Sequence, residues 1–141
     1  MLCVCWRTVG IASQLDTSSP LSDLSEIAME LAQFSEEMQQ CLNNCLACYR
    51  LCTATAAHVM HGQSARSEAA HLVSLLDCAQ ICSTHADFML RRSPHTMLLA
   101  SECEMICTAC ATQCEAHHDQ DGIMLACAEA CRKCAASCAL V

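Results

Sequence analysis

The stretch Cys41–Cys52, CLNNCLACYRLC, decides the fold because its cysteine spacing recurs twice more in the chain. The same pattern, C-x3-C-x2-C-x3-C, returns as CEMICTACATQC at Cys103–Cys114 and as CAEACRKCAASC at Cys127–Cys138. At about 100° per residue, the four cysteines of one stretch fall within roughly 60° of the helix circumference. Each stretch is therefore predicted to be a helix carrying one stripe of thiols. A shorter version, Cys78 and Cys82, predicts a fourth such helix.

Turn signals divide the chain into helices. Residues 1–21 are expected to be irregular, Gly62 ends the first predicted helix, and Ser93-Pro94 supplies an N-cap and a first helical residue for the third. The predicted helices run from about Ser22 to His61, Ser64 to Arg92, Ser93 to His117, and from the turn at 118–122 to about Ala139. Connections this short make consecutive helices antiparallel neighbours.

The sequence thus predicts an all-α fold, an antiparallel up-down-up-down four-helix bundle with a Cys-lined core. Residues 34–141 are expected to form the bundle, and residues 1–33 an N-terminal extension with a helical overhang. The apolar residues of that overhang are expected to cover the nearby bundle end as a plug or to pack on another subunit. They are Leu24, Ile27 and Leu31.

The composition excludes several classes of protein. A chain of 141 residues is long enough for one domain with its own core. With 16 Cys but only 3 Gly and 2 Pro, it has too few turn residues for a small disulfide scaffold. The net charge of −8 and the lack of a basic cluster argue against nucleic acid as a partner. No apolar run reaches the roughly 18 residues that a membrane span needs.

The N-terminal stretch MLCVCWRTVGIASQ is a poor signal peptide and contains no twin-arginine pair. The protein is therefore predicted to be cytoplasmic. In that compartment thiols stay reduced, so clustered cysteines indicate a metal site rather than disulfides.

The number of seam cysteines exceeds what an ordinary core needs, because the same layers contain almost no Leu, Ile or Val. Soft thiolates select Cu(I), zinc or iron–sulfur clusters. A structural zinc site needs four converging ligands, whereas each stripe here spreads its thiols along about 16 Å of helix. This arrangement favours many Cu(I) ions in a row, on the order of one per thiol. The predicted thiolate ligands are Cys41, Cys45, Cys48, Cys52, Cys78, Cys82, Cys103, Cys107, Cys110, Cys114, Cys127, Cys131, Cys134 and Cys138.

Imidazole and thioether groups extend the predicted ligand set. In an antiparallel bundle the turns near Gly62 and Asp119 lie at the same end, which brings His71, His117 and Met124 of the seam together. These groups bind Cu(I) more weakly than paired thiolates and suit a mouth where copper is loaded. His85, also on the seam beside Cys82, is predicted as a further ligand, and Met38 and Met89 as packing residues.

The repeated motif on three helices, together with Asp77-Cys78-Ala79-Gln80-Ile81-Cys82, resembles the bacterial copper storage proteins over about residues 34–141. Because it has no twin-arginine signal, the sequence resembles the cytosolic branch of this family. The resemblance implies several Cu(I) ions along the bundle axis, loading through one open end, and a homo-oligomer, in this family a tetramer. Thr55, Val59 and His71 stand where richer members carry thiols, which implies a lower capacity.

Other functions use the same residues differently. A thiolate metal buffer or a metallochaperone for Cu(I) or Zn(II) is the alternative, although a chaperone exposes one C-x2-C site on a loop. An iron–sulfur protein or thiol redox enzyme is not favoured, because no isolated Cys/His pair stands out and the ferredoxin spacing is absent. The protein is predicted not to be an enzyme. A purely structural bundle would lose nothing measurable when several seam cysteines are replaced.

Overall fold

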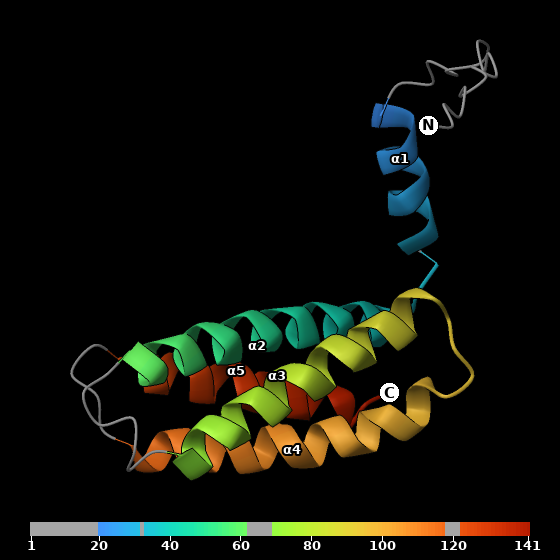
Figure 1. Cartoon of the computed structure of the whole chain (residues 1–141). Helices are drawn as coiled ribbons and strands as arrows, with labels where there is room; N and C mark the ends of the chain where they lie inside the picture. Colours follow the sequence, from blue (N-terminus) through green and yellow to red (C-terminus); the bar gives the residue numbers. More distant parts are fainter. Residues whose placement is uncertain (1–19, 32, 62–68, 118–121) are drawn as a thin grey trace, which may run out of the picture.

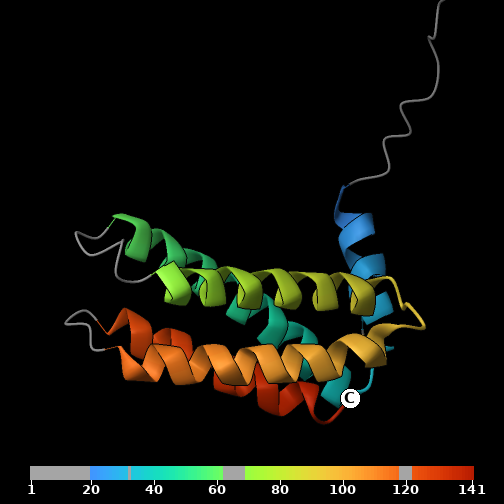
Figure 2. The ribbon, with the colours of Figure 1, turned by 60° about the horizontal axis from the view of Figure 1, so that its bottom comes forward.

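The structure is a computed structural model that describes residues 20–31, 33–61, 69–117 and 122–141. In these residues it contains five helices: α1 (Pro20–Leu31), α2 (Glu36–His61), α3 (Ala69–Leu90), α4 (Thr96–Ala116) and α5 (Ile123–Cys138). Helices α2 to α5 lie side by side as a bundle, and α1 stands away from its end (Figures 1 and 2). None of the described helices is long and apolar enough to cross a membrane.

The four bundle helices form a closed ring in which α2 packs on α3, α3 on α4, α4 on α5, and α5 back on α2. Sulfur contacts fix the directions: Cys41 meets Cys138, whereas Cys52 meets Cys127, so α2 and α5 run in opposite senses. The predicted all-α, antiparallel up-down-up-down bundle is confirmed. One end, where α2 ends and α5 begins, is called the mouth end here, and the other the far end.

The first helix is not continuous, contrary to the prediction of one helix from Ser22 to His61. Helix α1 ends at Leu31, and α2 begins at Glu36 behind the N-cap Ser35. The Ser35 hydroxyl accepts a hydrogen bond from the Met38 backbone N–H at 3.2 Å. Glu36 and Glu37 in the first turn add favourable charge at the helix N-terminus. These local signals start α2 as a separate helix, although the apolar periodicity continues from α1 into α2.

Two of the three apolar residues named for the overhang are uncovered in the single chain, and the side chain of the third, Leu31, lies outside the described part of the structure. Leu24 is 61% exposed and Ile27 52% exposed. In this structure they therefore do not plug the far end, and α1 points away from the bundle (Figure 1).

The turn between α3 and α4 also differs from the prediction that a helix starts at Ser93. The Ser93 N–H donates to the Phe88 carbonyl at 2.9 Å, and the Arg92 N–H donates to the carbonyl three residues before it at 2.9 Å. With Arg92 at φ 52°, this is a Schellman motif closing α3. Ser93 thus helps to close α3, and its hydroxyl and carbonyl also accept hydrogen bonds from the N–H groups of His95 and Thr96 at 3.3 and 3.2 Å. Helix α4 begins at Thr96, three residues after the predicted start.

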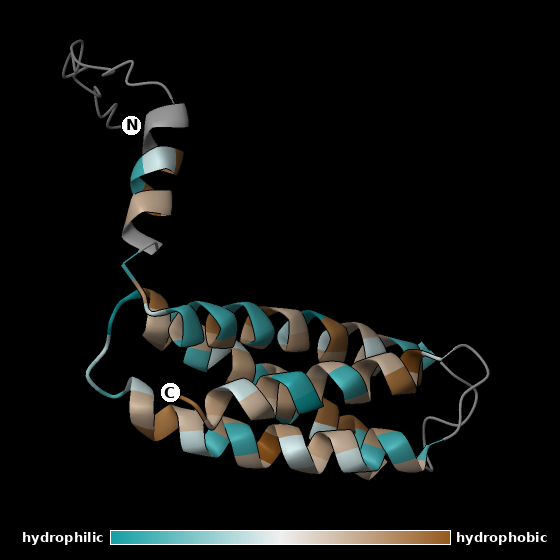
Figure 3. Cartoon of the chain, turned by 180° about the vertical axis from the view of Figure 1, so that it is seen from behind, coloured by the Kyte–Doolittle hydropathy of each residue, from teal (hydrophilic) through white to brown (hydrophobic). Residues whose placement is uncertain are grey.

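The core is a column of sulfur. All fourteen cysteines of the four bundle helices are buried, with exposures of 0–2%. Alanines such as Ala56, Ala86 and Ala111 pack beside them. Hydrophilic and hydrophobic residues recur in short groups along the bundle helices (Figure 3), as expected for helices that bury one face.

Candidate metal centre

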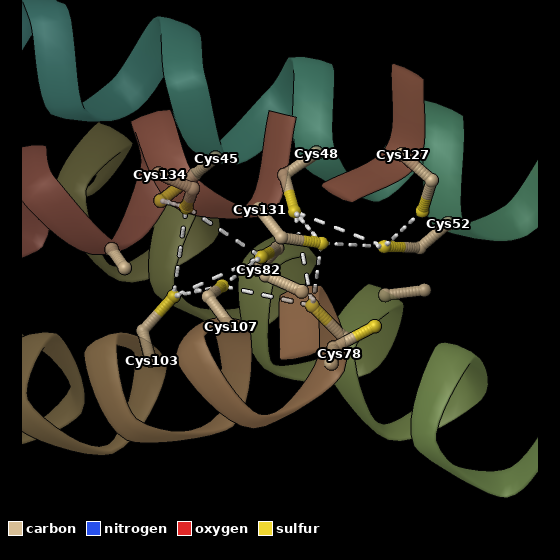
Figure 4. Packing of buried hydrophobic residues seen from close by; sticks show 14 of the residues in the cluster. Cys45, Cys48, Cys52, Cys78, Cys82, Cys103, Cys107, Cys127, Cys131 and Cys134 are labelled. Carbon is tan, nitrogen blue, oxygen red and sulfur yellow. Dashed lines mark hydrogen bonds between the residues drawn. The ribbon is translucent and has the colours of Figure 1, made fainter. Parts of the chain in front are cut away.

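The thiols of all four bundle helices point toward one another in the middle of the bundle (Figure 4). Neighbouring sulfur atoms lie between 3.4 Å, for Cys82 and Cys107, and 4.0 Å, for Cys103 and Cys134. Helices α2, α4 and α5 each supply a stripe because the i, i+4, i+7, i+11 spacing keeps their cysteines on one face, and α3 supplies Cys78 and Cys82 one turn apart. The stripes therefore merge into one continuous column, as the sequence predicted.

Four sets of four buried side chains within this column could each hold a metal ion, with all ligand atoms of a set within 4.8 Å of one another. Each set takes ligands from at least three helices. The sets are Cys41/Cys45/His85/Cys138, Cys45/Cys103/Cys134/Cys138, Cys48/Cys52/Cys78/Cys131 and Cys48/Cys82/Cys107/Cys134. The first, nearest the far end, is called the terminal set here.

Neighbouring sets share thiols. Cys45 and Cys138 belong to the terminal set and to the second set, and Cys48 and Cys134 also belong to two sets each. A shared thiolate can bridge two soft metal ions, so the sets suit a chain of ions rather than isolated sites.

The column is poorer in thiols toward the mouth end. Cys110, Cys114 and Cys127 are in none of the four sets, although the Cys127 sulfur lies 3.6 Å from that of Cys52. The fully buried Leu75 occupies the stripe of α3 one turn before Cys78. Thr55, also fully buried, occupies the stripe of α2 one turn after Cys52, which leaves fewer sulfur neighbours in this layer.

His85 is fully buried inside the thiol column. Its Nδ1 lies 3.6 Å from the Cys45 sulfur and 3.7 Å from the Cys138 sulfur. Besides its predicted place near Cys82 on the seam of α3, His85 therefore contacts thiols of α2 and α5. Burial opposes the charged form, yet hydrogen bonding to Cys103 and the charge of nearby thiolates raise the pKa of His85 above its ordinary value.

The three residues predicted for the mouth are brought together. The His71 Nε2 lies 3.4 Å from the Met124 sulfur, and the rings of His71 and His117 stack with centroids 4.1 Å apart. The His117 Nδ1–H donates a hydrogen bond to the Gln113 carbonyl oxygen at 2.7 Å. His58 is exposed at the same end, and His118 lies outside the described residues.

Hydrogen bonds between thiols set the protonation of the column. Bonds from Cys138 and then Cys45 lower the pKa of Cys41 to about 3. Bonding to Cys103 and Cys107 raises the pKa of Cys82. A sulfur that accepts S–H bonds is stabilised as a thiolate, and one that donates keeps its proton. A cation that binds here displaces the remaining protons.

Comparison with known proteins identifies the family. The family model for copper storage proteins matches residues 34–141. The cysteine-rich protein YhjQ of Bacillus subtilis is 31% identical over 112 residues, which cover 77% of this chain and 95% of that protein.

Solved structures of copper storage proteins are similar to this chain in fold. The Cu(I)-bound copper storage protein BsCsp3 is 26% identical, with a TM-score of 0.69 over 74% of this chain and 97% of its own. The copper storage protein Ccsp of Streptomyces lividans, loaded with 10 copper equivalents, is 25% identical, with a TM-score of 0.74 over 81% of this chain and 96% of its own. The S. lividans protein is described as cytosolic, and another of its structures holds five coppers. The chain belongs to the copper storage protein family.

Proposed function

We propose that this protein stores Cu(I), holding several ions per chain along its thiol column. The observation that carries the proposal is the sharing of buried thiols between neighbouring ligand sets, which links the sets into one path. The proposed ligands are the fourteen bundle cysteines with His71, His85, His117 and Met124. Residues 34–141 carry this function, and residues 1–33 form an extension to it.

Charge balance favours Cu(I) over zinc. Four thiolates around one Zn²⁺ leave two negative charges, and burying uncompensated charge is costly. The described core contains no Lys or Arg that could offset them. One Cu(I) per thiolate leaves no net charge. The alternative of a chaperone or a general thiolate buffer is less favoured, because all fourteen thiols are buried rather than presented for rapid exchange.

A Cu(I) titration tests this function. The fully reduced protein is titrated anaerobically against a strong Cu(I) chelator, with a parallel zinc titration as control. We expect tight uptake of roughly ten or more Cu(I) ions per chain, as thiolates shared between soft ions allow. Saturation at one or two ions would exclude storage.

Loading is proposed to occur at the mouth end, through His71, His117 and Met124. Replacing His117 by Ala and Met124 by Leu should slow Cu(I) uptake about tenfold, equivalent to about 1.4 kcal/mol in barrier, while most of the thiol capacity stays. The matched control is H58A, which alters an exposed histidine at the same end. Stopped-flow loading measures both rates, and equal rates for the two variants would rule out this loading site.

Copper affinity should increase with pH. Thiols with raised pKa, such as Cys82 and Cys131, hold protons at neutral pH that Cu(I) must displace, so acid competes with copper there. Cys41, with a pKa of about 3, is already a thiolate and adds little to this dependence. Chelator competition at a series of pH values measures the effect, and an affinity independent of pH would contradict it.

Two further proposals concern the setting of the protein. We infer a binding role rather than catalysis, in the cytoplasm, and the description of the S. lividans relative as cytosolic supports that compartment.

We also propose a homo-oligomer. Exposed apolar residues on the outer faces of α3 and α4, which include Val73, Leu76 and Leu98, support an interface between copies. Light scattering of the purified protein tests the oligomer.

A further inference from the structure

A cavity lined partly by methionines lies at the far end of the bundle, outside the thiol column. This cavity of about 420 Å³ lies between the start of α2, the α3–α4 turn and the start of α4. Three of its nine lining residues are methionines, Met38 from α2, Met89 from α3 and Met97 from α4. Three helices thus contribute a methionine to the lining of the same space.

This cavity adjoins the terminal set. Met38 lies three residues before Cys41, and Met89 lies four residues after His85, so each shares a helix face with a member of that set, one turn away. Met89 is 1% exposed and Met97 is 58% exposed, with the half-buried Met38 between these extremes. Exposure to solvent therefore falls from Met97 through Met38 to Met89, and Met89 lies one helical turn from His85 of the terminal set.

The chemistry of the lining suits Cu(I). Thioethers are soft, neutral ligands that bind Cu(I) more weakly than thiolates do, and weak binding allows exchange. The one charged lining residue in the cavity is Arg92. Its guanidinium donates to the Gln33 side chain at 3.2 Å and stacks 5.5 Å from the Phe34 ring, which ties its charge to the α1–α2 linker.

We propose that this cavity is a second point of Cu(I) exchange, where the thioethers of Met38, Met89 and Met97 bind the ion between solvent and the terminal set. The inference rests on the proposed storage function and goes beyond it. Copper can then enter or leave the column at the end opposite His71, His117 and Met124, without passing through the ions already stored.

Release kinetics test the proposal. The reduced full-length chain, carrying H117A and M124L so that the mouth contributes little, is half-loaded with Cu(I) and mixed with excess bicinchoninate. Adding M38L, M89L and M97L should slow Cu(I) transfer about tenfold. Leucine conserves volume and costs little stability, which circular dichroism verifies. The control adds M105L alone, a methionine on α4 with the same 58% exposure as Met97 but outside the cavity.

Equal release rates with and without the three leucines would overturn the proposal. A slower rate in the M105L control as well would also overturn it, because the effect would then not belong to the cavity. Copper uptake of the parent chain separates the two claims. If the parent binds only one or two ions, storage itself fails, whereas full uptake with unchanged release rates refutes the second exchange point alone.

Methyl resonances give an independent readout. With ¹³C-methyl methionine and stepwise addition of Cu(I), the signals of Met38, Met89 and Met97 should shift, and that of Met105 should not. Assignments come from the single leucine variants. If the methyl signals of the three cavity methionines do not shift with Cu(I) but change with protein concentration, a second copy of the chain fills the cavity, and the proposal is rejected.

Discussion

Replacing Cys45 and Cys48 together by alanine should remove most of the tightly bound copper. One or the other of these two residues belongs to each of the four ligand sets, and each is shared between two sets. Their loss therefore breaks every set and the bridges between them. We expect Cu(I) uptake against a strong chelator to fall by at least half, far more than two thiols out of fourteen would account for by number.

The matched control is C110A with C114A, which removes the same number of buried thiols from α4 but touches none of the four sets. That variant should lose about two ions at most. Metal and protein quantification after anaerobic loading measures both variants, and circular dichroism checks that both remain helical. Equal losses in the two variants would mean that the column binds copper uniformly, and the four sets would then have no special role.

Copper loading should raise the unfolding temperature of the protein strongly. A ligand that binds only the folded state, at a free concentration of about 1,000 times its Kd, adds about 4 kcal/mol of stability per site. Copper binding by the thiols of the unfolded chain reduces this gain. Even a fraction of that total corresponds to a shift of about 20 °C or more for a chain of this size. An ion held by the terminal set would also connect segments far apart in sequence, such as Cys41 and Cys138, whose sulfur atoms lie 3.6 Å apart.

Thermal unfolding followed by circular dichroism, with reduced apo protein and Cu(I)-loaded protein side by side, measures this shift. The C45A and C48A double variant should show a smaller shift than the parent. Identical unfolding temperatures for loaded and apo parent protein would show that copper does not bind in the core.

The thiol column could be predicted from the sequence because the cysteine spacing matches the helical period, and a period determines which face of a helix is buried. The partners across helices could not. His85 faces Cys45 and Cys138 because of the register between α2, α3 and α5, which depends on turns that no spacing within one helix encodes. The four ligand sets are products of that register.

Two helix boundaries were mispredicted because two local signals competed. At Ser35 the apolar periodicity favoured a continuous helix, but the hydroxyl cap and the two glutamates after it start α2 afresh. At Ser93 the Ser-Pro pair is typical of a helix start, yet the Ser93 N–H also closes the Schellman motif of α3, and regular α-helix begins only at Thr96. The cavity with Met38, Met89 and Met97 follows from these two boundaries, since it lies between them.

Arg92 has a consequence for anyone who redesigns this chain. It adopts φ 52° at the position of a Schellman motif where glycine is usual, so a consensus approach to stability would choose Arg92→Gly. That exchange would relax the backbone of one corner. It would also remove the link to Gln33 and Phe34, which joins segments 59 residues apart. The Arg92→Gly variant would therefore gain local backbone preference and lose the side-chain contacts between the α3–α4 turn and the α1–α2 linker.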